Sequence, residues 1–243
     1  MDLSLSQKRM RETTLLLEIE NRLDQERCAL VVIDGDCGAG KTTLANEIVT
    51  HLFQGTVIPM DHFFLPANLR SEERLQAPGG NIHFERFREE ILEVLLAGTP
   101  SGIPPTASSP GKEPWKPFRY GQYDCRSGRM IPRRVIPRPL VIIEGSYSLH
   151  PAFSGGYKAL HALRVFLSVS PGEQQRRLQK RDPALWERFR QEWIPLEKAY
   201  AIAYHVKSSA DISLCTDEWV DENTGRICPE AVGRSARKHH AGK

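Results

Sequence analysis

The stretch from Leu30 to Ile48, LVVIDGDCGAGKTTLANEI, constrains the fold of this 243-residue chain more than any other. It holds the pattern G-x-x-x-x-G-K-[ST] at Gly35–Thr42, directly after an unbroken apolar run and before apolar residues at helical spacing. The run predicts a strand covered on both faces, and the pattern predicts a loop that opens a helix. Glycines let the N–H groups of such a loop point at phosphate oxygens, and the helix start adds partial positive charge. The stretch therefore predicts a site for a nucleoside triphosphate.

The side chains of this loop have distinct expected roles. We expect Lys41 to reach the β- and γ-phosphates of ATP as a point charge, and the Thr42 hydroxyl to ligate Mg²⁺. The side chain of Cys37 is expected to point away from the phosphates. The expected nucleotide-binding residues are Gly35, Asp36, Cys37, Gly38, Ala39, Gly40, Lys41, Thr42 and Thr43.

Apolar runs and helical segments alternate along the rest of the chain. Strands are expected at residues 28–34, 56–60, 139–145, 163–169 and 210–216. Helices are expected at residues 1–28, 39–52 and 84–98 and, interrupted at Pro183 and Pro195, at residues 171–206. Strands that alternate with helices predict an α/β fold with a parallel sheet flanked by helices.

The segments between these elements set the expected domain organisation. Residues 99–117 are rich in Pro, Ser and Gly and predict a loop, and residues 118–135 predict a β-hairpin that turns at Ser127-Gly128. We expect a single P-loop domain at residues 1–228, followed by a basic flexible tail at residues 229–243. Within the domain, residues 99–135 form an inserted loop and hairpin, and residues 171–205 form a lid and helical region.

Composition and charge indicate which classes of partner and which cellular compartment we expect. The segment Gly233–Lys243 holds four Lys or Arg and no acid, so the remainder balances 33 − 4 = 29 bases against 30 acids. A nucleic-acid partner is therefore not expected. No apolar run approaches the roughly 18 residues of a membrane span, and charges occupy the N-terminus where a signal peptide needs an apolar stretch. The five cysteines include no CxxC pair, which predicts reduced thiols, no zinc site and a cytoplasmic protein.

Polar residues stand at the carboxyl ends of the expected strands, where parallel sheets bind their ligands. They are Asp34, Asp61, Glu144 and the turn after Val169. We expect Asp61 to orient an acceptor hydroxyl and to take its proton late, as a loose phosphoryl-transfer transition state allows. Glu144 is expected to lie close to Mg²⁺.

A basic helical face is expected beyond the fourth of these strands. Arg177 and Arg181 are four residues apart and share this face, with Arg176 and Lys180 beside it. As a lid, these charges would fold over the triphosphate, offset the charge that builds on the transferred group and exclude water. The residues expected to pack in the core beyond the lid are Trp193, Ile194, Leu196 and Tyr200.

The chain resembles the uridine kinase group, which is related to phosphoribulokinase and bacterial pantothenate kinase. Six segments carry the resemblance, in this order: GDCGAGKTT, MDHFFLP, GGNIHFERFREEIL, YDCRSGR, VIIEGSYSL and RRLQKRD…WIPLEKAY…SSADISL. They span roughly Ala29 to Leu214. The resemblance implies the P-loop NTPase fold with a hairpin substrate arm and a helical lid. It also implies ATP and Mg²⁺ as cofactors and the 5′-hydroxyl of a pyrimidine nucleoside as acceptor.

The resemblance also assigns catalytic residues. Asp61 matches the catalytic Asp of the family's D-x-F-Y segment, Glu144 matches the family's E-G turn, and the family has arginines in matching places in its lid. The catalytic residues implied are Asp61, Lys41, Arg177 and Arg181, and the metal ligands implied are Thr42 and Glu144.

The acceptor residues follow the family pattern with departures. Tyr123 matches the hairpin tyrosine that closes over the nucleoside base, and His62 and Phe64 vary the D-x-F-Y segment. The base-contacting His of the family has no counterpart near Gly128, and His83 stands where the family offers an Asp to the ribose hydroxyls. The substrate residues implied are Asp61, Phe64, His83 and Tyr123.

The residues leave other functions open. Another alcohol, such as pantothenate, a sugar or a sugar phosphate, is an alternative acceptor, and Arg133, Arg134 and Arg138 near the hairpin would favour a phosphorylated one. In a P-loop ATPase or a regulatory nucleotide-binding module, Asp61 would have no acceptor to orient. The adenine pocket is expected around Cys215 to Trp219, the choice between ATP and GTP is open, and so is the oligomeric state, a homo-oligomer included.

Overall fold

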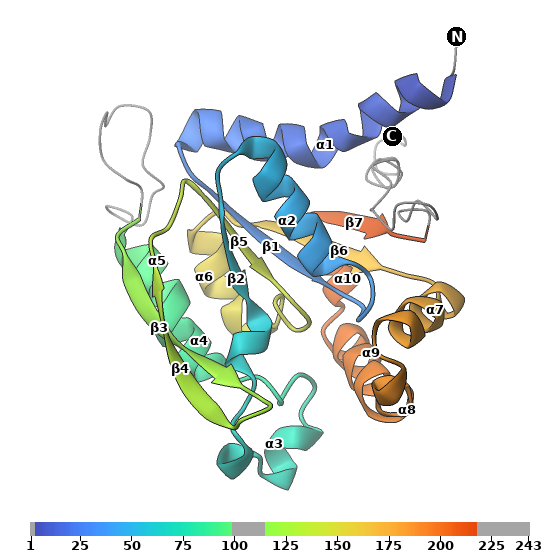
Figure 1. The fold of residues 1–243 in the computed structure, drawn as a ribbon. Coiled ribbons are helices and arrows are strands. Elements are labelled where there is room, and N and C mark those ends of the chain that lie inside the picture. The colour runs from blue at the N-terminus through green and yellow to red at the C-terminus, as the bar shows by residue number, and fades with distance from the viewer. Residues whose placement is uncertain (1–2, 99–114, 218–243) are drawn as a thin grey trace, which may run out of the picture.

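The computed structural model describes residues 3–98 and 115–217, with side chains from residue 14 onward (Figure 1). The expected basic tail, Cys228, Trp219 and most of the expected loop at residues 99–117 lie outside the described residues. No helix in the described ranges combines the length and apolar content that crossing a membrane requires.

Five strands form a parallel sheet in the order β2-β5-β1-β6-β7. Their bounds are β1 Ala29–Gly35, β2 Thr56–Pro59, β5 Leu140–Glu144, β6 Leu163–Ser168 and β7 Ile212–Cys215. In the central strand β1, Val31 aligns with Ile142 of β5 and with Leu163 of β6. Every residue of β1 and β5 is buried. The predicted strands are confirmed, and burial on both faces explains their unbroken apolar sequences.

Helices cover both faces of the sheet, which gives three layers (Figure 1). On one face, Val31 and Ile33 pack with Ile19 of α1 (Leu3–Glu26) and with Ile48 of α2 (Lys41–Leu52). Because side chains alternate along a strand, Leu30 and Val32 point to the other face. The elements on that face include α4 (Phe84–Phe87), a π-helical turn (Arg88–Leu92), α5 (Glu93–Gly98), α6 (Ser154–Ala159), α9 (Ile194–Ala203) and α10 (Val206–Ser209).

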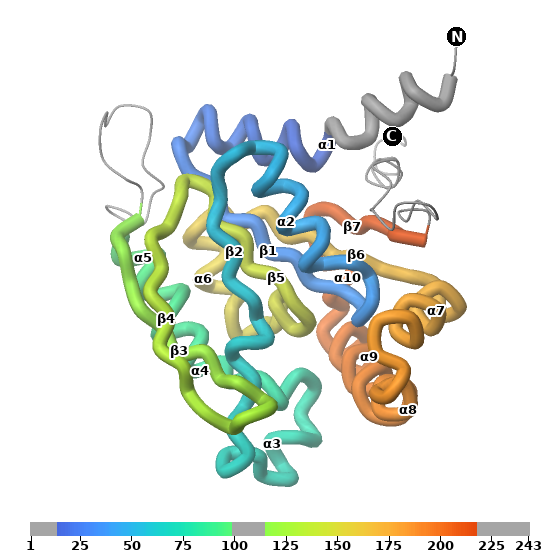
Figure 2. The backbone as a smooth tube through the Cα atoms, in the orientation of Figure 1, coloured from blue at the N-terminus to red at the C-terminus, as the bar shows by residue number. Residues whose placement is uncertain are grey.

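Two further parts extend from this sandwich. The strands β3 (Phe118–Asp124) and β4 (Arg129–Val135) pair antiparallel, and Gly128 turns between them with a φ of 67°, which confirms the predicted hairpin. The other part, the helical arm, runs from Pro171 to Ala203. It comprises α7 (Pro171–Arg181), a 3-10 turn (Pro183–Leu185), α8 (Trp186–Arg188), a π-helical turn (Phe189–Trp193) and α9. Figure 2 shows the hairpin beside β2 and the helical arm beyond the other side of the phosphate loop.

The helical arm departs from its sequence-based description in two ways. The predicted break at Pro183 is confirmed, but the predicted break at Pro195 is wrong, because helical backbone continues through it. Pro195 falls in the first turn of α9, next to the π-helical turn, and there a missing N–H costs little. Leu196 is 44% exposed and does not pack in the core as predicted, whereas Tyr200 is buried.

The sequence-based description also omitted several short elements. These are 3-10 turns at Met60–Phe63, Ala67–Leu69 and Pro151–Phe153, and the helices α3 (Glu72–Gln76), α6 and α10. Each spans only a few residues, which is too short for a helical period to show in the sequence. The turn at Met60–Phe63 follows β2 directly and carries Asp61.

Candidate active site

The phosphate loop, Gly35–Thr42, joins the carboxyl end of β1 to the start of α2. A Cβ atom at Gly35 would overlap the carbonyl oxygen of Leu167 in β6, so close packing of the strands excludes larger residues there. Gly40 precedes α2 with a φ of 90°, a left-handed conformation that favours glycine. Among the described residues, the backbone N–H groups of Gly38, Gly40 and Lys41 have no hydrogen-bond partner. These donors stand at a helix start, where an anion is favoured.

Lys41 is held inside the loop. Its buried Nζ donates to the carbonyl oxygens of Gly35 at 2.7 Å and Asp36 at 3.0 Å, and to the Ser146 hydroxyl at 3.1 Å. The carbonyls accept its hydrogen bonds but carry no full charge to neutralise it. The ammonium group is therefore fixed in position as a positive charge at the expected phosphate site.

Thr42 and Glu144 meet at the edge of the sheet. The Thr42 hydroxyl donates to Oε2 of Glu144 at 3.0 Å. Burial and the nearby charge of Asp61 raise the pKa of Glu144, while the Thr42 hydrogen bond and Lys41 oppose the rise. The described residues contain no cluster of three or more His, Cys, Asp or Glu that would hold a metal ion by itself. This oxygen pair fits Mg²⁺, which takes few protein ligands and completes its shell with phosphate oxygens and water.

Asp61 follows β2 in the 3-10 turn Met60–Phe63. Its side chain reaches solvent, yet the protein atoms around it remove enough water to raise the pKa of its carboxyl group. The positive charges of Lys41 and Arg181 oppose that rise. Pro59, the last residue of β2, aligns with Glu144 at the end of β5, so the turn that carries Asp61 begins at the same edge of the sheet as the Thr42–Glu144 hydrogen bond.

The two predicted lid arginines differ in their surroundings. The guanidinium of Arg181 lies 5.2 Å from the centre of the Phe189 ring, and its charge acts on Asp61. Arg177 instead donates to Glu173, to the carbonyl of Gly38 at 3.2 Å, and to both oxygens of Thr216. Arg177 therefore ties α7 to the phosphate loop and to the residue after β7. Its contact with phosphate stays a prediction.

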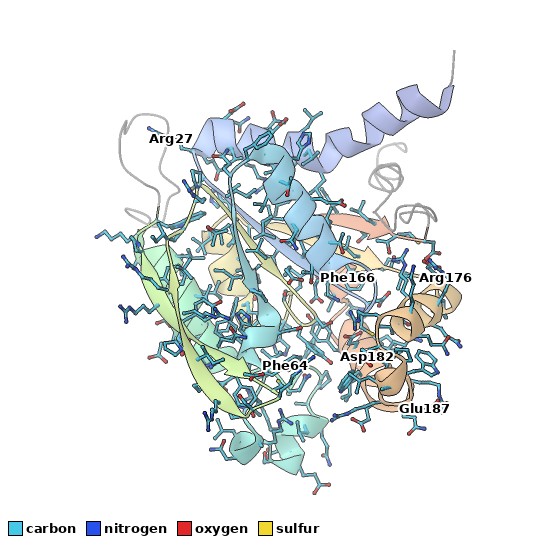
Figure 3. All side chains as sticks on the ribbon, in the orientation of Figure 1. Arg27, Phe64, Phe166, Arg176, Asp182 and Glu187 are labelled. Atoms are coloured by element: carbon cyan, nitrogen blue, oxygen red, sulfur yellow. The ribbon has the colours of Figure 1, made fainter. Side chains whose placement is uncertain are left out.

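A third basic residue of α7, Arg176, points elsewhere. Arg176 lies on the outer side of the helix, away from the sheet (Figure 3), and pairs with Glu173 at 2.7 Å. Cys37 behaves as expected, because its buried side chain packs with Leu178 and Phe189 of the helical arm. Burial and the charge of Glu197 raise the pKa of the Cys37 thiol, so it stays protonated.

The predicted substrate residues have structural contacts of their own. Phe64 follows the Asp61 turn (Figure 3) and forms a β-bridge with Ile82. The ring of His83 accepts a hydrogen bond from the backbone of Arg86 at 3.4 Å and so caps α4. Tyr123 is 7% exposed, opposite Met130 in the hairpin. Contact of Phe64, His83 and Tyr123 with an acceptor stays a prediction.

Hydrogen bonds fasten the hairpin to the Asp61 turn. His62 Nδ1 lies 2.8 Å from the Tyr120 hydroxyl, and Arg86 donates to the carbonyl of His62 at 2.7 Å. Burial and the charges of Arg133 and Arg86 lower the pKa of His62 to about 4, so its ring is neutral near pH 7. At the tip of the hairpin, partial burial raises the pKa of Cys125, which the charge of Arg70 lowers and that of Asp61 raises. The contact between His62 and Tyr120 therefore holds the hairpin to the turn that carries Asp61.

Motif reasoning missed three residues that organise the loop. Asp34, noted only as a strand-end acid, faces inward and accepts from the N–H groups of Gly35 and Leu149 and from the Tyr200 hydroxyl. Apart from the turn that contains Ser146, no sequence pattern indicates that Ser146 or Glu197 contacts the phosphate loop. Their contacts come from segments more than a hundred residues away from the phosphate loop, which no local pattern reveals.

Comparisons with known proteins match this geometry at the level of fold. No family model matches the sequence, and no curated protein sequence matches it. A structure described as a possible uridine kinase from Bacillus stearothermophilus aligns with a TM-score of 0.56 at 17% identity, covering 84% of this chain and 97% of that one. A candidate fructose transport system kinase from a Silicibacter species gives 0.52 at 21% identity, with coverages of 83% and 98%.

A third structure extends the comparison to eukaryotes. A candidate P-loop kinase with a circular permutation, from Saccharomyces cerevisiae, aligns with a TM-score of 0.60 at 12% identity, covering 86% of this chain and 99% of that one. At these identities the likeness concerns the fold. This chain has the α/β fold of the P-loop kinases, as its sequence predicts.

Proposed function

We propose that this chain, which has the P-loop kinase fold, transfers the γ-phosphoryl group of ATP to a hydroxyl group of a small molecule, with Mg²⁺. The observation that carries the proposal is the position of Asp61, exposed to solvent in the turn after β2, whose last residue Pro59 aligns with Glu144, the hydrogen-bond partner of Thr42. A carboxylate in this position suits a general base that orients an incoming hydroxyl.

The proposed reaction is a single displacement at phosphorus. The acceptor oxygen forms a bond to the γ-phosphorus, the bond from that phosphorus to the β–γ bridging oxygen breaks, and ADP leaves. The acceptor proton passes to the Asp61 carboxylate. Lys41 and Arg181 offset the negative charge on the transferred group, and N–H groups of the phosphate loop hold the remaining phosphates. Thr42 and Glu144 would hold Mg²⁺, which would neutralise further negative charge on the phosphates.

The first acceptor that we propose is the 5′-hydroxyl of a pyrimidine nucleoside. Two considerations support it: the resemblance of the motifs around Asp61 and Tyr123, and the hydrogen bond that holds Tyr120 of the hairpin to His62 in the Asp61 turn. One of the structures with this fold is described as a possible uridine kinase.

A second candidate acceptor is a sugar or a sugar phosphate. The charge of Arg70 acts at the hairpin tip, next to Cys125, where an anionic group on the acceptor would be favoured. Arg70 is anchored through Nε to the carbonyl of Leu65 at 2.8 Å, which fixes the position of its guanidinium. Another structure with this fold is described as a candidate fructose transport system kinase.

The test is ATP consumption with Mg²⁺ against a panel of alcohols. The panel holds uridine, cytidine, purine nucleosides, fructose, pantothenate and ribulose 5-phosphate. We expect ADP formation that depends on one class of acceptor, with a phosphorylated product identified by mass spectrometry. ATP hydrolysis that is the same with and without every alcohol would contradict the proposal and favour an ATPase. Activity with ribulose 5-phosphate alone would favour the second candidate.

A further inference from the structure

The side chain of Glu197 reaches the phosphate loop from the helical arm. Its carboxylate accepts a hydrogen bond from the backbone N–H of Cys37, with Oε2 2.8 Å from that nitrogen. The other oxygen, Oε1, accepts from the Ser146 hydroxyl at 2.6 Å. Hydrogen bonds to a carboxylate are shorter and stronger than neutral ones, so this side chain is firmly placed.

Ser146 extends this contact to the lysine of the loop. Its hydroxyl donates to Glu197 and accepts from Nζ of Lys41 at 3.1 Å. A closed chain of contacts therefore runs from Cys37 through Glu197 and Ser146 to Lys41. It joins the first half of the phosphate loop to the lysine at its end.

The contact between α9 and the phosphate loop involves one face of the helix. Glu197 is three residues before Tyr200, so the two side chains share that face. Tyr200 donates to Oδ2 of the buried Asp34 at 2.8 Å, at the end of β1. Leu196 and Lys198, the neighbours of Glu197 in sequence, are exposed. The face of α9 that carries Glu197 is thus the face that meets the phosphate loop and β1.

We propose that Glu197 is a positioning residue for the phosphates of the nucleotide, an inference that rests on the proposed function. The carboxylate occupies the N–H of Cys37 and leaves those of Gly38, Gly40 and Lys41 without a partner among the described residues. It thereby fixes the first half of the loop so that the remaining donors are presented together. Donors held in place before binding lose less entropy when phosphate arrives.

Both carboxylate oxygens of Glu197 act as acceptors in this role. In Glu197→Gln, the amide oxygen can accept from Cys37, but the amide nitrogen can only donate to Ser146. The Ser146 hydroxyl would then accept from both Lys41 and the amide, and its own hydrogen would lose the carboxylate that now accepts it and orients the group. Glu197→Gln should therefore disturb both the loop and the position of Lys41.

The experiment measures the equilibrium affinity of the full chain for ATP, ADP and adenosine, without turnover. We expect Glu197→Gln to weaken ATP and ADP about tenfold, the loss of roughly one charge-assisted hydrogen bond, and to leave adenosine unchanged. The matched control is Glu192→Gln, because Glu192 is an exposed acid of the same arm that pairs with Arg188. Its affinities should equal those of the original chain.

A double variant separates positioning from loss of structure. Because the effect on Lys41 passes through Ser146, Glu197→Ala and Ser146→Ala should not multiply. The double variant should bind ATP about as weakly as the weaker single variant. Wild-type ATP affinity in Glu197→Gln would overturn the proposal. Tighter ATP binding, equal losses for ATP and adenosine, or multiplying effects of the two alanine variants would also overturn it. Because nucleotide affinity needs no acceptor, a failed acceptor panel would leave this result interpretable.

Discussion

At the scale of single residues, the partners of two acids at the carboxyl ends of β1 and β2 give them opposite tasks. Asp34 has its oxygens filled by N–H donors and the Tyr200 hydroxyl, and it faces the interior. Asp61 has side-chain surface exposed to solvent and nearby charges from Lys41 and Arg181. A carboxylate whose oxygens are all occupied can brace a fold, whereas one that is open can receive a proton.

Replacing Asp61 tests its assigned task. Asp61→Asn should lower kcat by about 10²–10⁴-fold while ATP binding is retained, since the amide cannot take the acceptor proton. Burial raises the pKa of Asp61, so the ionised form is lost as pH falls through a value above the ordinary 3.8. The activity of the original chain should therefore decrease as pH is lowered through that value. Initial rates measured across a range of pH test this. The control is Asp24→Asn, an exposed acid of α1.

An Asp61→Asn variant with near-normal kcat would remove Asp61 as the base. The loss of ATP binding in the same variant would instead indicate a role in holding the nucleotide.

Motif residues were predictable because a short pattern fixes them relative to strand ends. Lys41 and Thr42 begin the helix after β1, Glu144 ends β5 and Asp61 follows β2, and the parallel sheet brings such strand ends to one edge. Glu197 was not predictable in this way. Its partner Cys37 is 160 residues away, and the contact exists only because α9 packs across the loop.

At the scale of elements, Asp34 is the point where three parts of the chain meet. It lies in β1, accepts from the N–H of Tyr147 in the turn after β5, and accepts from Tyr200 of α9. The sequence predicted the strand and the helix separately from their periods, but no local pattern indicated this junction. The same holds for Pro195, whose effect on the helix depends on the π-helical turn before it.

Removing one hydroxyl tests this junction. Tyr200→Phe should lower the free energy of unfolding by about 1.5–3 kcal/mol, the cost of losing a hydrogen bond to a charged group. Denaturant titration measures the change. The control is Tyr204→Phe, because Tyr204 packs against the same aromatic cluster and no hydrogen bond of its hydroxyl is seen among the described residues.

The pH dependence of this variant has a definite sign. Burial raises the pKa of Asp34 to about 6, and the Tyr200 hydrogen bond is among the contacts that hold it down. A raised carboxyl pKa means that stability falls as pH rises from about 4 to the folded-state value. Tyr200→Phe should raise the folded-state pKa of Asp34 further, so the loss of stability continues to a higher pH. The difference in free energy of unfolding between the original chain and Tyr200→Phe should therefore be larger at pH 8 than at pH 5. A deficit that is equal at both pH values would show that the hydrogen bond does not act on the charged form.

At the scale of the whole molecule, the apolar core is divided unequally. Two large clusters lie on the faces of the sheet, and a small third cluster joins Cys37 of the phosphate loop to Leu178 and Phe189 of the helical arm. The part of the arm before α9 therefore has few buried apolar residues to stabilise it. Regions of this kind open locally at lower free energy than the strands of a core.

Amide hydrogen exchange tests this division. We expect residues 171–193 to exchange faster than β1, β5 and β6 in the free chain, because the small cluster and a few hydrogen bonds of Gln174 and Arg177 fasten them to the phosphate loop and to Thr216. A non-hydrolysable ATP analogue should slow exchange in residues 171–193 and in the phosphate loop by roughly tenfold or more, about 1.4 kcal/mol, since phosphates join Lys41 to Arg181. Adenosine, which lacks phosphates, should slow it much less. The prediction is wrong if residues 171–193 exchange as slowly as the central strands, or if adenosine slows their exchange as much as the ATP analogue does. The arm would then be a fixed part of the core, and Arg181 would act without any movement of the arm toward the nucleotide.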